Sequence, residues 1–123
     1  MEEKQVKTDE IIELAKGCCH VLDTKKGSDI LLIDLRKINN YLDYFIIATG
    51  NSFVHCKALA IESQKYFKSH AFKERTKSRL DTGWIALDYI DIVVHIFTQE
   101  MRDFYQLEKL WADGNFLNYQ GSD

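Results

Sequence analysis

The clearest hydrophobic pattern in the chain runs from Ile90 to Phe97, where residues alternate between two series as they do along a β-strand. The series of Ile90, Ile92, Val94 and Ile96 is wholly apolar and should line a core. The other series carries Asp91, Val93, His95 and Phe97. A second strand-like run precedes this one, from Trp84 to Tyr89, and together they predict a β-hairpin.

The hairpin leads directly into a predicted helix. Thr98 is a plausible helix cap, and Phe104, Leu107 and Trp111 follow it at helical spacing on one side, which predicts an amphipathic helix. Trp111 is therefore expected in the core, while Arg102 and Tyr105 lie off the apolar stripe and are better contact candidates.

The rest of the chain predicts alternating helices and strands. Apolar and capping patterns predict a helix over 9–24, buried strands over 29–35 and 44–49, a helix from the cap Ser52 to Ser69, and a short edge strand over 72–77. This order predicts an α/β (α+β) two-layer fold with a mixed sheet flanked by helices. We expect one domain over 1–113 and a loosely held tail over 114–123.

Charge is distributed unevenly along the 123 residues. The net charge of −3 makes polyanion binding through bulk positive charge unlikely. Residues 57–79, however, hold seven Lys or Arg against two acids, and residues 83–113 hold six acids against two basic residues. The basic segment could favour RNA phosphates and the acidic segment a basic protein; solvated surfaces are the simpler alternative.

Cellular location and redox state also follow from composition. No apolar run approaches the roughly 18 residues that span a bilayer, and the acidic N-terminus is untypical of a signal peptide, so we expect a cytoplasmic protein without membrane contact. The three cysteines, Cys18, Cys19 and Cys56, are odd in number and two are adjacent, which favours reduced thiols buried in helices.

Two motifs with a fixed order and separation resemble a known family, the ribosomal silencing factors, also called Iojap-like proteins. The first is Asp43-Tyr44-Phe45-Ile46-Ile47-Ala48-Thr49-Gly50-Asn51-Ser52 with His55 and Ala58. The second is Trp84-Ile85-Ala86-Leu87-Asp88-Tyr89, then Asp91-Ile92-Val93-Val94-His95-Ile96-Phe97, then Glu100, Arg102, Phe104-Tyr105, Leu107-Glu108 and Leu110-Trp111.

This resemblance implies a nucleotidyltransferase-like fold without catalysis. It also implies docking on large ribosomal subunit protein fourteen, which blocks joining of the small subunit and represses translation when nutrients are scarce. Two positions depart from the family pattern. Ile90 stands where Gly is common, so we expect a different hairpin, and Val54 replaces a long polar residue before His55, which puts a contact there in doubt.

Enzyme and metal chemistry find little support in the residues. Nucleotidyl transfer needs two carboxylates one residue apart on a strand to hold metal ions, whereas Asp88 and Asp91 are three apart. The Gly50-Asn51-Ser52 turn is more typical of a helix cap than of a phosphate site. The Cys18-Cys19-His20 and His55-Cys56 runs lack the spacing of zinc ligands. We expect neither cofactor nor metal.

The residues favour a non-enzymatic binder, and the resemblance implies the large ribosomal subunit as its partner; whether the lysine-rich helix makes a secondary contact with ribosomal RNA is left open by the sequence. His95 is expected to be a hydrogen-bonded structural residue, and Trp84 fits an interface as well as it fits a core. The alternatives are a metal-dependent nucleotidyltransferase-like enzyme and a scaffold that forms homodimers when free. The predicted partner-binding residues are Trp84, Asp88, Tyr89, Arg102, Tyr105 and Glu108.

Overall fold

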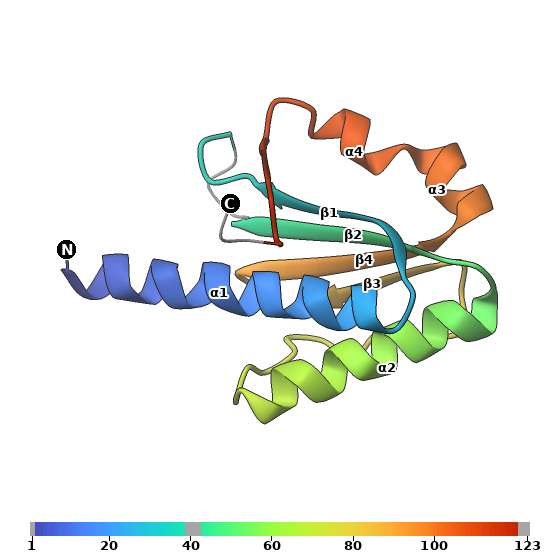
Figure 1. The fold of residues 1–123 in the computed structure, drawn as a ribbon, viewed down its shortest axis with the longest axis horizontal. Helices are drawn as coiled ribbons and strands as arrows, with labels where there is room; N and C mark the ends of the chain where they lie inside the picture. Colours follow the sequence, from blue (N-terminus) through green and yellow to red (C-terminus); the bar gives the residue numbers. More distant parts are fainter. Residues whose placement is uncertain (1, 39–42, 121–123) are drawn as a thin grey trace.

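A five-stranded mixed sheet forms the centre of the protein (Figure 1). The computed structural model describes residues 2–38 and 43–120. The strand order is β3-β4-β2-β1-β5; β2 and β4 are parallel, and the other neighbours are antiparallel. The elements are α1 (Glu2–Thr24), β1 (Ser28–Asp34), β2 (Tyr44–Gly50), α2 (Phe53–Ser69), β3 (Trp84–Asp88), β4 (Ile92–Thr98), α3 (Gln99–Tyr105), α4 (Leu107–Leu110) and β5 (Asn115–Leu117). The predicted α+β class is confirmed.

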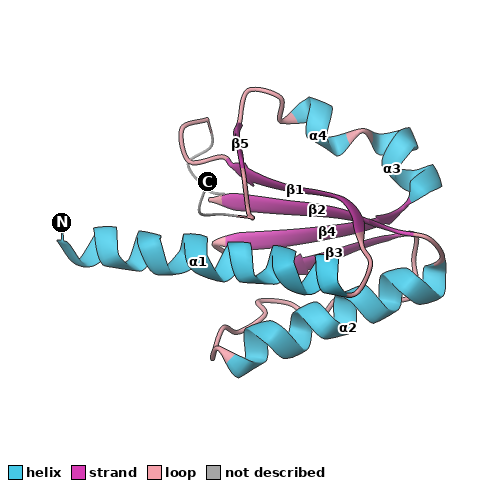
Figure 2. Cartoon of the chain, viewed as in Figure 1, coloured by secondary structure: helices cyan, strands magenta, loops and turns pink. Residues whose placement is uncertain are grey.

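Helices cover the two faces of the sheet unequally. Helices α1 and α2 lie together on one face, while the short α3 and α4 lie on the other (Figure 2). None of the helices in the described part of the chain combines the length and the apolarity that a membrane crossing requires. On the other face, α3 contacts β4 and β2, while Leu107 and Trp111 pack against the buried cluster of Ile33, Leu35, Phe45, Ile47 and Phe97.

The alternation predicted for β4 divides the core into two clusters. Ile92, Val94 and Ile96 belong to the cluster under α1 and α2, and Phe97 belongs to the cluster under α3 and α4. Every residue of β2 is buried, as its continuous hydrophobicity predicted, because both of its faces are covered. Ile90 does not join the core: it is 51% exposed and lies in the turn before β4.

Close contacts between the two long helices explain a glycine inside α1. A Cβ atom at Gly17 would lie 2.0 Å from the hydroxyl oxygen of Tyr66 in α2. That hydroxyl donates a hydrogen bond to the Leu14 carbonyl at 2.9 Å. Gly17 therefore costs some helix propensity but lets the Tyr66 side chain reach the α1 backbone.

Three predicted features differ from the structure. Residues 72–77 form a loop and not a strand: the Arg75 N–H donates to the Asp88 carbonyl of β3 at 2.7 Å, but no ladder of backbone hydrogen bonds follows. The last helix is interrupted at Gln106, whose φ of 46° ends α3 before α4 begins. The domain boundary was expected at Asp113, whereas Asn115–Leu117 pairs with β1 as the edge strand β5.

The hairpin between β3 and β4 contains a strained residue. Ile90 has φ 74°, and the Asp91 N–H donates to the Tyr89 carbonyl at 2.9 Å across it, which are features of a γ-turn. The Asp88 carboxylate accepts from the Ile90 N–H at 2.8 Å and helps to hold this turn. A β-branched residue therefore takes up a left-handed conformation that glycine adopts without cost.

Replacing Ile90 should stabilise the protein. Left-handed backbone strain costs about 1–3 kcal/mol, and the larger entropy of glycine in the unfolded chain offsets about 0.4–1 kcal/mol of the gain. We expect Ile90→Gly to raise the free energy of unfolding by about 1 kcal/mol in urea titrations. Ile90→Val, which keeps the branched Cβ, should change it little; equal effects of the two substitutions would contradict the assignment of strain.

Candidate partner-binding surface

The six predicted contact residues do not form one patch, because the structure divides them among three places. Trp84 and Tyr105 are adjacent, with ring centroids 4.7 Å apart. Asp88 and Tyr89 lie at the opposite end of β3, in the hairpin. Arg102 and Glu108 pair with each other at the break between α3 and α4. Of the three pairs, only Trp84 and Tyr105 can still serve as exposed aromatic contacts.

Trp84 combines the two roles that the sequence left open. Its side chain is half-buried on the α3 side of the sheet, where its ring lies 5.1 Å from that of Phe97. Its indole Nε1–H donates a hydrogen bond to Nδ1 of His95 at 3.0 Å. The hydrogen bond to His95 therefore fixes the nitrogen side of the indole, while part of the ring remains accessible to solvent.

His95 fixes the indole through a buried, neutral imidazole. The residue is 6% exposed, and burial lowers the pKa of its imidazole from 6.5 to about 4. Because Nδ1 accepts from Trp84, the proton of the neutral ring must reside on Nε2, which has no hydrogen-bond partner among the described residues. The expected structural role of His95 is confirmed, with Trp84 as its partner.

Exposed apolar side chains extend this site beyond Trp84. Phe104 is 76% exposed and Tyr105 47%, with their rings edge to face at 4.9 Å. Phe53, 59% exposed, lies at the start of α2, and its ring atom Cε1 is 3.3 Å from the position that a Cβ of Gly83 would occupy. We call Trp84, Phe53, Phe104 and Tyr105 the aromatic patch. Sequence reasoning missed Phe53 and wrongly assigned Phe104 to the core.

The misassignment of Phe104 comes from the break at Gln106. A continuous helix would place Phe104, Leu107 and Trp111 on one side, but the left-handed Gln106 rotates α4 relative to α3. Leu107 and Trp111 consequently pack on the sheet, with the Trp111 ring 5.7 Å from that of Phe45, whereas Phe104 faces outward. The expected core position of Trp111 is thus confirmed in part, since it is half-buried.

Arg102 was expected at the surface and is instead buried. Its side chain is 6% exposed, its Nη1 donates to the Thr49 hydroxyl at 2.8 Å, and its Nε donates to Glu108 at 3.2 Å. These contacts tie both short helices to the carboxyl end of β2. Arg102 therefore positions the segment that carries Phe104 and Tyr105 and cannot itself reach a partner in this conformation. Its partner Glu108 is 28% exposed.

Tyr89 and Asp88 are likewise engaged inside the protein. Tyr89 is 3% exposed, its ring lies 4.2 Å from that of Phe67, and burial raises its pKa above the ordinary value. The expectation that Tyr89 is an exposed contact is wrong, because it packs under α2. Asp88 forms an ion pair with Arg75, whose Nε donates to it at 3.0 Å, and it also holds the hairpin turn.

The groups considered for catalysis and metal binding also have structural partners. Within residues 2–38 and 43–120, no three His, Cys, Asp or Glu side chains gather as a metal site would require. Cys18, Cys19 and Cys56 are free and buried, and burial raises the pKa of the Cys18 thiol to about 12. His55 accepts from the Asn51 N–H at 2.9 Å, and its other ring nitrogen contacts the Lys25 carbonyl oxygen at 2.9 Å, so it fastens two loops together.

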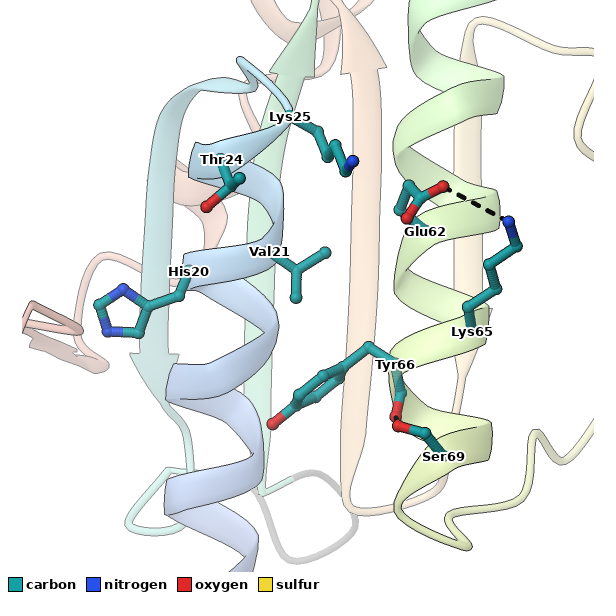
Figure 3. Close-up of a pocket in the computed structure, with 8 residues that line it drawn as sticks. All are labelled: His20, Val21, Thr24, Lys25, Glu62, Lys65, Tyr66 and Ser69. Atoms are coloured by element: carbon teal, nitrogen blue, oxygen red, sulfur yellow. Dashed lines mark hydrogen bonds and ion pairs between the residues drawn. The ribbon is translucent and has the colours of Figure 1, made fainter.

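A shallow groove of about 430 Å³ lies between α1 and α2 (Figure 3). Four of its polar side chains are engaged within the protein: the Tyr66 hydroxyl donates to the Leu14 carbonyl, the Ser69 hydroxyl donates to the Tyr66 carbonyl at 2.7 Å, and Lys65 pairs with Glu62 at 3.6 Å. Its lining residues are His20, Val21, Thr24, Lys25, Glu62, Lys65, Tyr66 and Ser69.

The buried imidazole of His95 predicts a pH-dependent stability. The unfolded chain takes up a proton below pH 6.5, whereas the folded protein does so only near pH 4, so stability falls as the pH drops through this window. His95 should contribute a loss of about 2–3 kcal/mol between pH 7 and pH 4.5. Denaturant titrations of His95→Gln should lack this contribution, whereas the exposed control His70→Gln should retain it. An equal loss in His95→Gln and the unmodified protein would contradict the prediction.

Comparison with known proteins assigns the chain to a family. The family model described as "Ribosomal silencing factor during starvation" matches residues 8–122. Ribosomal silencing factor RsfS of Bacillus subtilis is 35% identical over 104 residues, which cover 84% of this chain and 86% of the relative. The mouse protein "Mitochondrial assembly of ribosomal large subunit protein 1" is 28% identical over 100 residues, 78% of this chain and 44% of the relative.

The solved structures agree with this assignment. A crystal structure of a protein from Chromobacterium violaceum matches with a TM-score of 0.76 and 32% identity, covering 81% of this chain and 84% of that one. The family is named for the silencing of ribosomes, which is a regulatory role. The chain belongs to the ribosomal silencing factor family.

Proposed function

We propose that this protein docks on the large ribosomal subunit through its protein fourteen and prevents the small subunit from joining. Translation would then be repressed when nutrients are limiting, in the cytoplasm. The family match over residues 8–122 carries this proposal. The mechanism requires no chemistry, because a 14.4 kDa body at the joining surface excludes the other subunit by its volume.

The aromatic patch is the surface that we assign to this partner. Large aromatic side chains dominate binding energy when they become desolvated at the centre of an interface. Trp84 and Tyr105 are held side by side, and Phe104 and Phe53 extend the apolar area on either side of them. The exposed acids Glu100, Asp103 and Asp113 lie on or after α3 and would complement a basic protein and accelerate encounter.

Of the two rival functions, only self-association has an observation in its favour. The aromatic patch, together with Val54 at 80% exposure, could bury itself against a second copy when the protein is free. Such a dimer would use the same surface as the ribosome and would compete with it. Light scattering without ribosomes measures dimerisation, and nucleotide turnover with magnesium tests the enzyme alternative.

Substitutions within the aromatic patch should weaken binding to isolated large subunits. Phe104→Ala and Tyr105→Ala remove exposed rings with little effect on folding, and each should raise the Kd about tenfold or more, since hot-spot aromatics contribute over 1 kcal/mol. Trp84→Ala should abolish co-sedimentation. Binding is measured by sedimentation with purified subunits, followed by a subunit-joining assay.

A matched control lies on the opposite edge of the sheet. Phe116 in β5 is 43% exposed, and Phe116→Ala removes a comparable ring outside the aromatic patch. This variant should bind and inhibit joining as the unmodified protein does. If folded Phe104→Ala and Tyr105→Ala variants bind normally, the aromatic patch is not the interface; if the unmodified protein leaves joining unaffected at saturation, the proposed function itself is wrong.

A further inference from the structure

The segment from α2 through the following loop to β3 carries a charge opposite to that of the rest of the chain. Residues 57–88 contain seven basic and four acidic residues, a net charge of +3, whereas the remainder of the chain carries −6. The loop leaves the end of α2 and returns to β3 (Figure 1). Positive charge is therefore concentrated on one part of the fold although the whole protein is acidic.

The acidic side chains of this segment are already engaged within it. Glu62 pairs with Lys65, Asp81 with Arg79, and Asp88 with Arg75. Glu74 accepts hydrogen bonds from the Gln64 amide at 3.0 Å and the Ser78 hydroxyl at 2.7 Å. Four exposed lysines make no ion pair with any residue that the structure describes. They are Lys57, Lys68, Lys73 and Lys77, which we call the lysine strip.

Internal contacts hold the lysine strip on a fixed scaffold. The loop is fastened to α2 through Gln64 and Glu74, and to β3 through the Arg75 N–H, which donates to the Asp88 carbonyl at 2.7 Å. Ser78 adds a hydrogen bond to the Ala86 carbonyl at 2.7 Å. A loop without regular structure is therefore anchored on two elements. Its lysines project from a backbone that loses little further entropy when they bind.

We propose that the lysine strip binds phosphates of ribosomal RNA beside the protein contact made by the aromatic patch. This inference rests on the proposed function, which brings the protein to a surface where RNA and protein lie together. Lys57 follows Phe53 by one turn of α2, so the strip begins at the edge of the aromatic patch. Lysine ammonium groups neutralise phosphates as point charges and need no base-specific geometry.

The dependence of affinity on salt tests this proposal. Each phosphate that a lysine neutralises adds about 0.7–0.9 to the slope of log affinity against log salt concentration. The triple variant Lys68→Gln, Lys73→Gln and Lys77→Gln should therefore reduce the slope for large-subunit binding by about two to three, and should weaken binding at least tenfold at about 50 mM salt. The variant Lys25→Gln, Lys26→Gln and Lys37→Gln removes the same net charge from exposed positions elsewhere and should leave the slope unchanged.

Two further measurements distinguish a failure of this inference from a failure of the proposed function. Phe104→Ala should weaken subunit binding without changing the slope, because it removes no phosphate contact. The affinity of the unmodified protein for purified large-subunit RNA should depend more steeply on salt concentration than the affinity of the variant Lys68→Gln, Lys73→Gln and Lys77→Gln for the same RNA. Should the subunits fail to bind at all, the proposed function fails while this RNA measurement still decides the role of the strip. Equal slopes for the two triple variants, or equal affinity for RNA and polyglutamate, would overturn the proposal.

Discussion

The parallel pairing of β2 with β4 is the constraint on which the rest of the structure depends. Seven consecutive residue pairs, from Tyr44 opposite Ile92 to Gly50 opposite Thr98, bring the carboxyl ends of both strands to one edge. A parallel pair requires a crossover, which α2 supplies on one face of the sheet. Because α2 and α3 both start at that edge, Phe53 and Met101 come close to Gly83, which directly precedes Trp84.

The candidate interface is held in place by polar groups that are themselves inaccessible. His95 fixes the indole of Trp84, and Arg102 ties α3 and α4 to Thr49 and Glu108. Because Arg102 is itself buried, it acts on the surface only through the position of the helix that carries it. His95, Thr49, Arg102 and Glu108 all belong to the two motifs by which the chain resembles the family, and each makes a structural contact here.

Charge separates the two proposed contacts on a single small domain. The lysine strip lies on α2 and the loop after it, and the exposed acids gather around α3 and after α4. The net charge of −3 hides this division, because it is the sum of a basic segment and a more acidic remainder. The two surfaces suit partners of opposite charge, and both kinds of partner occur side by side on a ribosomal subunit.

The sequence alone determined the elements whose pattern is local. Alternation identified β4 and its two faces, unbroken hydrophobicity identified β2, and the side chains of Ser52 and Thr98 cap α2 and α3 as predicted. These features depend on neighbours along the chain, so spacing suffices to find them. Only the tertiary structure decided which side chains remain exposed: Arg102 and Tyr89 are buried, and Phe104 is not. The reason is that the turn at Gln106 and the packing of Tyr89 on Phe67 depend on contacts between distant segments.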